Sequence, residues 1–166
     1  VIFRIKRVVD ASLYGKKTTF SKITNLISLL SVVGIVLYVI ITWKNIPDMI
    51  PGHYNIAGEI DKYSSKNSIW ILIVVQILLF TMMSVLERFP NIWNTGVQIT
   101  EENRERVYTN LRNMQTYLKM MIMIYFSYMT FQSIGGGNLH SMSIFIFLVL
   151  VFGGMAIFLV KIFKNR

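Results

Sequence analysis

The chain has 166 residues, of which 54% are hydrophobic and only 15% are charged. An average soluble domain carries about 25% charged residues, so this composition lacks many of the groups that keep a protein surface hydrated. The absence of cysteine excludes disulfides, thiolate metal ligands and cysteine nucleophiles. The net charge of +9 would suggest a nucleic-acid partner in a soluble protein, so the positions of the charges decide how it is interpreted.

The N-terminal segment 1–22 alternates apolar and basic residues ahead of the first long apolar run. A helix over residues 1–13 would place Ile2, Ile5 and Val9 near one face, which suits an interfacial helix on the inner leaflet. The alternative is a basic flank that only orients the first span. In both cases the segment is a basic cytoplasmic region that precedes a membrane domain over residues 23–166.

Four apolar runs follow, and each is long enough to cross a bilayer as a helix. A hydrocarbon core of about 30 Å needs about 20 helical residues. The runs cover residues 23–43, 68–86, 114–134 and 142–160, and the only charged residue in them is Lys119. The first run is too long for the apolar part of a cleaved signal peptide. The sequence therefore predicts an all-α, polytopic membrane protein that folds as a bundle of four transmembrane helices.

The basic residues are distributed unevenly among the segments that connect these runs. If the N-terminal segment, the second connection and the C-terminus are cytoplasmic, fourteen Lys and Arg residues lie inside and three lie outside. This asymmetry fits the positive-inside rule with both termini in the cytoplasm. The positive charge is thus explained by topology and by contact with anionic lipid, and no direct nucleic-acid partner is expected.

The second cytoplasmic connection ends with a signal for the start of a helix. Thr100, followed by Glu101 and Glu102, is typical of an N-cap with acidic residues in the first turn. We expect a helix from about Glu101 that continues into the third span and projects from the inner membrane face. Lys119 would lie little more than a turn inside the bilayer, with its ammonium group extended back to the headgroups.

The predicted spans contain few groups that could carry an ion. Their central parts lack Asp, Glu, Arg and His, which argues against a proton-coupled transporter or a cation pump. Gln76 and Gln132 are the most polar side chains at depth, and we expect each to form a hydrogen bond between helices.

The first outer connection, residues 44–67, contains a polar stretch with several interpretations. Residues 51–66 read PGHYNIAGEIDKYSSK, in which two glycines allow positive φ and one proline fixes φ. The segment NIAGEI could close a short hairpin, and Asp61 is short enough to cap the backbone locally. The stretch is either a compact structural connector or a recognition surface for an extracellular ligand.

A metal site is a third interpretation of the outer loops. His53 and Asp61 lie in the first outer loop, and His140, the only other histidine, lies in the second. A four-helix bundle brings its two outer loops together, and two histidines with one carboxylate are suitable Zn²⁺ ligands that leave a position open for water. The spacing matches no established metal-binding motif. Zn²⁺ is the only cofactor that the sequence suggests.

Two stretches resemble a bacterial membrane family of unknown function that shares its outer-loop module with SdpI-type immunity proteins. In IPDMIPGHYNIAGEIDKYSSK the matching positions are Pro47, Pro51, His53, Asn55, Gly58, Asp61 and Lys66. In ITEENRERVY the matching positions are Thr100, Glu102, Asn103 and Tyr108.

The resemblance implies a protein of the bacterial cytoplasmic membrane without enzymatic activity. Related immunity factors protect a producer cell from its own secreted toxin, and some signal to a repressor held at the membrane. We therefore expect an immunity or sensor protein that binds a secreted peptide or envelope ligand through Pro51, His53, Asn55, Gly58, Asp61 and Lys66. A cytoplasmic partner would contact Glu102, Asn103, Arg106 and Tyr108. The alternatives are a metal-dependent hydrolase at the outer leaflet and an accessory subunit of a larger membrane complex.

Overall fold

The computed structural model describes residues 14–164, so the predicted interfacial helix over residues 1–13 lies outside the described part of the chain. The described residues form four long helices and one pair of strands. In chain order these elements are α2 (Thr19–Thr42), β1 (Met49–Tyr54), β2 (Ile60–Ser65), α3 (Ile69–Leu86), α4 (Arg104–Gly135) and α5 (Ser143–Lys164). Short 3-10 helices, Trp43–Asn45, Lys66–Ser68 and Pro90–Ile92, join them.

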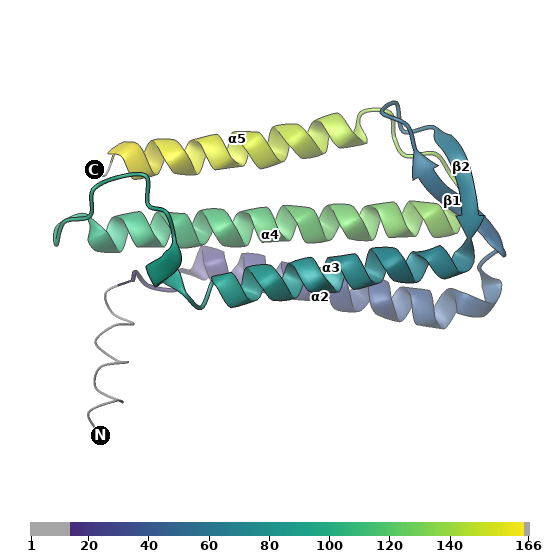
Figure 1. Ribbon diagram of the computed structural model, residues 1–166, viewed down its shortest axis with the longest axis horizontal. Coiled ribbons are helices and arrows are strands. Elements are labelled where there is room, and N and C mark those ends of the chain that lie inside the picture. Colours follow the sequence, from purple (N-terminus) through teal and green to yellow (C-terminus); the bar gives the residue numbers. More distant parts are fainter. Residues whose placement is uncertain (1–13, 165–166) are drawn as a thin grey trace, which may run out of the picture.

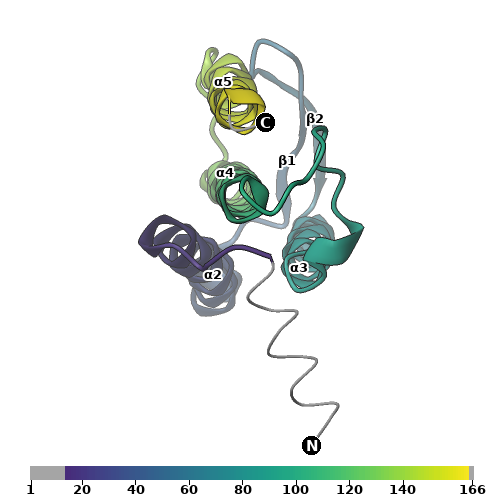
Figure 2. The same cartoon turned by 90° about the vertical axis from the view of Figure 1, so that its left-hand side faces the viewer.

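The four helices run along the long axis of the molecule, and α4 is the central one (Figure 1). The other three helices each pack against α4. Viewed along the axis, α5 lies on one side of α4, while α2 and α3 lie on the other (Figure 2). The strand pair closes one end of the bundle, opposite the start of α2 and the end of α5 (Figure 1). Because the predicted topology puts that strand pair outside, we call its end the outer end.

Within residues 14–164, three helical segments are long and apolar enough to cross a membrane: Thr19–Asn45, Lys66–Leu86 and Ser143–Lys164. They coincide with the first, second and fourth predicted spans. The remaining predicted span, 114–134, lies within α4, which is not among the three. The central position of α4 explains its lower apolar content, because Thr116 and Lys119 are buried against the neighbouring helices and need no lipid-facing surface.

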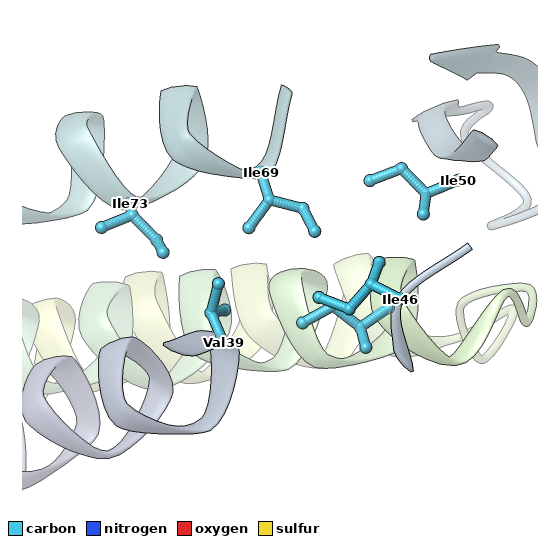
Figure 3. Close-up of a cluster of buried hydrophobic side chains, with 6 residues drawn as sticks. Val39, Ile46, Ile50, Ile69 and Ile73 are labelled. Carbon is cyan, nitrogen blue, oxygen red and sulfur yellow. The ribbon is translucent and has the colours of Figure 1, made fainter. Parts of the chain in front are cut away.

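Apolar side chains fill the outer end of the bundle. Val39, Ile46, Ile50, Ile69, Ile73 and Ile134 form one buried cluster. Figure 3 shows Ile69 and Ile73 of α3 pointing toward Val39 and Ile46, with Ile50 of β1 beside them. Burying an aliphatic side chain of this size stabilises a fold by about 1.5–3 kcal/mol relative to leaving it in water. The cluster therefore anchors β1 to the ends of α2 and α3.

A second apolar cluster closes the inner end. Val107, Tyr108, Leu111 and Ile162 are buried there, joining α4 to the end of α5. Tyr14 and Trp93 pack around Tyr108, with ring centroids 5.0 Å and 6.2 Å away. The inner connection between α3 and α4 is therefore folded onto the bundle.

Between the two clusters the interior of the bundle contains buried polar side chains. Gln76 is fully buried, and its Nε2 donates to the Met123 carbonyl at 3.0 Å and to the Ser127 hydroxyl at 2.9 Å. Ser127 in turn donates to the Ser31 carbonyl at 3.1 Å. This chain of bonds links α3 to α4 and α4 to α2, which confirms the predicted interhelical role of Gln76. Gln132 was also predicted to bond between helices, and that prediction is wrong. Its Nε2 donates to the Asn138 carbonyl in the connection between α4 and α5.

The antiparallel pair of β1 and β2 corrects the all-α prediction, although the structure is mostly helical. Met49, Ile50 and Pro51 pair with Ser65, Ser64 and Tyr63. The register shifts on both sides of His53, which pairs with Lys62. A proline is tolerated in such a strand because a two-stranded sheet has only edge strands, where the missing N–H need not pair.

Candidate binding site beneath the outer hairpin

The turn between β1 and β2 is organised by Asn55. Its side-chain Oδ1 accepts from the backbone N–H groups of Ala57 and Glu59, at 2.9 Å and 3.0 Å. Gly58 completes the turn with a φ of 82°, a left-handed conformation that glycine adopts without strain. Asn55 and Gly58, both predicted to bind ligand, therefore shape the hairpin that carries the other predicted residues.

The second outer loop, which connects α4 to α5, packs onto this hairpin. The Leu139 N–H donates to the Gly58 carbonyl at 2.8 Å, and the Ile60 N–H donates to Asn138 Oδ1 at 3.0 Å. The Tyr54 hydroxyl donates to the Gly137 carbonyl at 3.3 Å. A side chain at position 58 would collide with the Leu139 carbonyl, so glycine is required for this approach as well as for the turn. The predicted meeting of the two outer loops is confirmed.

His53 and Asp61 form a pair on the exposed part of the hairpin. The His53 Nδ1 atom lies 2.6 Å from Asp61 Oδ1, and the two side chains are 65% and 42% exposed. With Nδ1 engaged by the carboxylate, Nε2 is the ring nitrogen left for a ligand. The predicted sequence motif thus contains a fixed imidazole that faces solvent.

The remaining two predicted ligand residues serve the scaffold. Lys66 Nζ lies 2.9 Å from Asp48 Oδ1 and 5.6 Å from the ring centre of Trp43, so it ties the end of β2 to the segment before β1. The Pro51 carbonyl accepts from the Ser133 hydroxyl at 2.5 Å, which fixes β1 to the outer end of α4. Both contacts hold the hairpin in place over the bundle.

The predicted Zn²⁺ set of His53, Asp61 and His140 is not assembled. Among residues 14–164 there is no group of three or more His, Cys, Asp and Glu side chains that could hold a metal ion. The His140 Nδ1 atom instead accepts from the Met142 N–H at 3.3 Å, next to the start of α5. The docked residues Asn138 and Leu139 fix the loop, and His140 then belongs to the helix start rather than to the His53–Asp61 pair.

A cavity of about 280 Å³ lies beneath the hairpin, between the outer ends of three helices. Its roof is the β1 strand and the turn, including His53, Tyr54 and Gly58. Its walls come from Leu72 of α3, from Tyr125, Met129 and Ser133 of α4, and from Ser143 and Ile144 of α5. Burial raises the pKa of Tyr54. Its one hydroxyl proton is donated to the Gly137 carbonyl, so a ligand would meet the lone pairs of the hydroxyl oxygen. The cavity therefore combines apolar walls with a polar roof.

The predicted cytoplasmic partner residues divide into two buried and two exposed. Asn103 exchanges two hydrogen bonds with Thr100, its backbone N–H donating to the threonine hydroxyl and its Oδ1 accepting from the Thr100 N–H. This reciprocal cap starts α4 at Arg104, three residues after the predicted position. Tyr108 is buried in the inner cluster. Glu102 and Arg106 are exposed, so they alone of the four are available to a partner.

Lys119 differs from its prediction. Its Nζ lies 3.2 Å from Glu87 Oε2 and 3.1 Å from the Ser84 hydroxyl, inside the bundle rather than among lipid headgroups. Asn25 Nδ2 donates to the other oxygen of Glu87 at 3.2 Å, so α2, α3 and α4 meet at one carboxylate. A lone lysine in an apolar run marked the position, but the run itself does not show whether the lysine pairs with an acid or reaches the headgroups.

Part of the chain matches a known family model. Residues 30–77 match the family model of a domain of unknown function, DUF1648. The matched segment runs from the middle of α2 through the hairpin to the middle of α3, so it contains the roof of the cavity and one of its walls. No curated protein and no solved structure matches the chain.

Proposed function

We propose that the protein is a receptor of the bacterial cytoplasmic membrane, of the immunity or sensor type. Its outer hairpin and the cavity beneath would bind a secreted peptide or an envelope ligand. The observation that carries this proposal is the cavity itself, because its roof contains His53 and its walls belong to three different helices. A mostly apolar pocket with a few convergent polar groups is the usual form of a ligand site.

The proposal includes a specific topology, with α4 as a fourth span and both termini in the cytoplasm. Support for this topology comes from the thirteen basic residues assigned to the inner side, Lys119 not counted, against three assigned to the outer side. It also comes from the burial of Lys119 against Glu87, since pairing removes most of the cost of placing a lysine in the bilayer.

The relation to SdpI-type immunity proteins is part of the same proposal. The matched DUF1648 segment includes Pro51, His53, Asn55, Gly58 and Asp61, the core of the outer-loop resemblance. Two of these residues build the turn, one anchors the strand, and two form the exposed imidazole–carboxylate pair. These roles support the proposal that Pro51, Asn55 and Gly58 hold the hairpin in a fixed conformation, in which His53 and Asp61 are exposed to a ligand.

Helix α4 gives a physical route from the cavity to the cytoplasm. It carries Met129 and Ser133 in the cavity wall and the exposed Arg106 at its inner end, in one uninterrupted helix of 32 residues. A ligand transmits a signal only if it binds one packing of the helices better than another. Because the cavity wall includes α3, α4 and α5, a ligand there has direct contact with the packing it would change.

Survival assays test the proposed function. A sensitive bacterium that expresses the chain would be challenged with a panel of membrane-active secreted peptides. We expect the wild type to protect against at least one peptide, and His53→Ala and Asp61→Ala to abolish that protection at unchanged expression. His140→Ala is the matched control, because that histidine lies in the other outer loop and makes no contact with Asp61. Equal protection by His53→Ala and the wild type would contradict the role of the hairpin.

A further inference from the structure

The position of the cavity indicates how a ligand reaches it. Leu72 lies in the first turn of α3 and Ile144 in the first turn of α5, while Met129 and Ser133 lie in the last two turns of α4. The cavity is therefore at the outer ends of the helices, where headgroups give way to acyl chains in a bilayer. A ligand already dissolved in the outer leaflet is at the correct depth.

The side of the cavity is formed by two helices that are held apart by a third. Both α3 and α5 pack on α4, and the end view shows them on different sides of it (Figure 2). The outer surface is covered instead by β1 and by the second outer loop, which docks on the hairpin through Leu139 and Asn138. Among the described helices, only α3, α4 and α5 line the cavity, so a lateral approach would pass between α3 and α5.

The lining defines the chemistry of the ligand. Leu72, Met129 and Ile144 offer apolar surface, and Met129 has the flexible side chain that adapts to chains of varied shape. Above them, the roof carries His53, whose Nε2 is not engaged by Asp61, and Tyr54, whose hydroxyl donates to the Gly137 carbonyl and keeps a lone pair for a donor on the ligand. We infer, on the basis of the proposed function, that the ligand is a membrane-borne amphiphile whose single apolar chain enters sideways from the outer leaflet and whose polar head meets His53 and Tyr54.

The size of the cavity separates this ligand from a folded peptide. At about 280 Å³ it lies just below the range of about 300–1,000 Å³ that drug-sized ligands occupy. One extended hydrocarbon chain fits such a space, whereas a helical segment with its side chains, about 10 Å across, requires displacement of the hairpin. The hairpin is held on the helices by the Ser133–Pro51 hydrogen bond and by Ile50 in the outer apolar cluster, so that displacement is costly.

Photo-crosslinking in a bilayer tests the inference. The full chain would be reconstituted into phosphatidylcholine–phosphatidylglycerol vesicles that contain a single-chain lysophosphatidylcholine with a diazirine on its acyl chain. After illumination, adducts are mapped by mass spectrometry. We expect severalfold higher labelling at Met129 and Ile144 than at Val149, which is exposed on α5. Met129→Trp fills the cavity and should reduce labelling at Ile144 severalfold, while Ile157→Trp on the exposed part of α5 should not.

Each result separates the inference from the proposed function. Labelling at Ile144 that equals labelling at Val149, and that Met129→Trp leaves unchanged, would show adventitious bilayer contact only and overturn the inference. If the wild type still protects cells and Met129→Trp does too, the receptor role stands without the amphiphile. A protective peptide that itself crosslinks to Met129 while the lipid does not would assign the cavity to peptide and also overturn the inference. Specific lipid labelling without protection by any variant would support the lipid site and remove the receptor role.

Discussion

Lys119 on α4 and Glu87 at the end of α3 form a buried ion pair, with Nζ and Oε2 3.2 Å apart. Their side chains are only 2% and 10% exposed. Ser84 and Asn25 supply further hydrogen bonds to the two charged groups. The pair therefore fixes the relative position of three helices near the inner end, at a site where neither charge has water as an alternative partner.

Removal of the lysine should destabilise the bundle strongly. Lys119→Met leaves Glu87 buried without its cation, a change that typically costs about 3–5 kcal/mol. Thermal unfolding in mild detergent measures the effect, with Lys44→Met as the control because Lys44 is exposed. The double variant Lys119→Met, Glu87→Leu should recover much of the loss, since no unpaired charge remains. Equal unfolding temperatures for Lys119→Met and Lys44→Met would show that the pair does not form.

The contact of α5 with α4 depends on one of two adjacent glycines. A Cβ atom at Gly154 would overlap the ring of Tyr117, whereas nothing lies within 4 Å of the corresponding position at Gly153. Tyr117 is also held by a 2.8 Å hydrogen bond to the Leu150 carbonyl. We expect Gly154→Leu to cost about 1–3 kcal/mol by overpacking, and Gly153→Leu to cost much less.

Unfolding transitions of the two leucine variants in the same detergent check this prediction. Both substitutions add the same apolar side chain to neighbouring positions of α5, so helix propensity and lipophilicity are matched. The prediction would be wrong if the two variants unfolded together, because α5 would then pack on α4 through a different face.

Substitution of Gly58 should undock the second outer loop from the hairpin. Gly58→Ala places a Cβ 2.7 Å from the Leu139 carbonyl and forces alanine into a left-handed conformation that costs about 1–2 kcal/mol. Gly137→Ala is the matched control in the same region, because nothing lies within 4 Å of its added atom. Hydrogen exchange at the Leu139 and Ile60 amides should accelerate in the first variant and not in the second.

Single cysteines test the topology directly, since the natural chain has none. Ile56 at the hairpin turn is 85% exposed, and Glu102 is exposed at the other end of the bundle. A membrane-impermeant maleimide should label Ile56→Cys in intact cells and Glu102→Cys only after permeabilisation. Labelling of both residues from outside would show that α3, the helix between them, does not span the membrane.

The positions of the apolar runs and of the polar outer motif could be predicted from the sequence. The residues that contact them in the fold could not. Uncharged runs of about 20 residues have few structural alternatives, so the bounds of three spans were predicted closely. Thr100 was recognised as a cap because that pattern is local. Lys119 was not assigned to Glu87, because the two are 32 residues apart and a lysine near a helix end also satisfies its charge at the headgroups.

The sequence indicated only part of the candidate site. The motif lies in the hairpin that roofs the cavity, yet only His53 and Asp61 expose their functional atoms, while Asn55, Gly58 and Lys66 support the fold. The cavity walls on α4 and α5 carry no sequence signal, because Met129 and Ile144 are ordinary residues of apolar helices. Asn103 and Tyr108 were assigned to a partner, but contacts with Thr100 and with Tyr14 bury them.

The central position of α4 has a consequence for biosynthesis. The chain makes α2 and α3 first, and Glu87 emerges 32 residues before Lys119. At a synthesis rate of about 5–20 residues per second, Lys119 is made about 2–6 s after Glu87, and Glu87 has no ion-pair partner during that time. During that interval the first two spans cannot reach their final arrangement, because the surface they pack against has not been translated. A cell would therefore hold a short-lived intermediate in which α2 and α3 are complete and Glu87 has no cation.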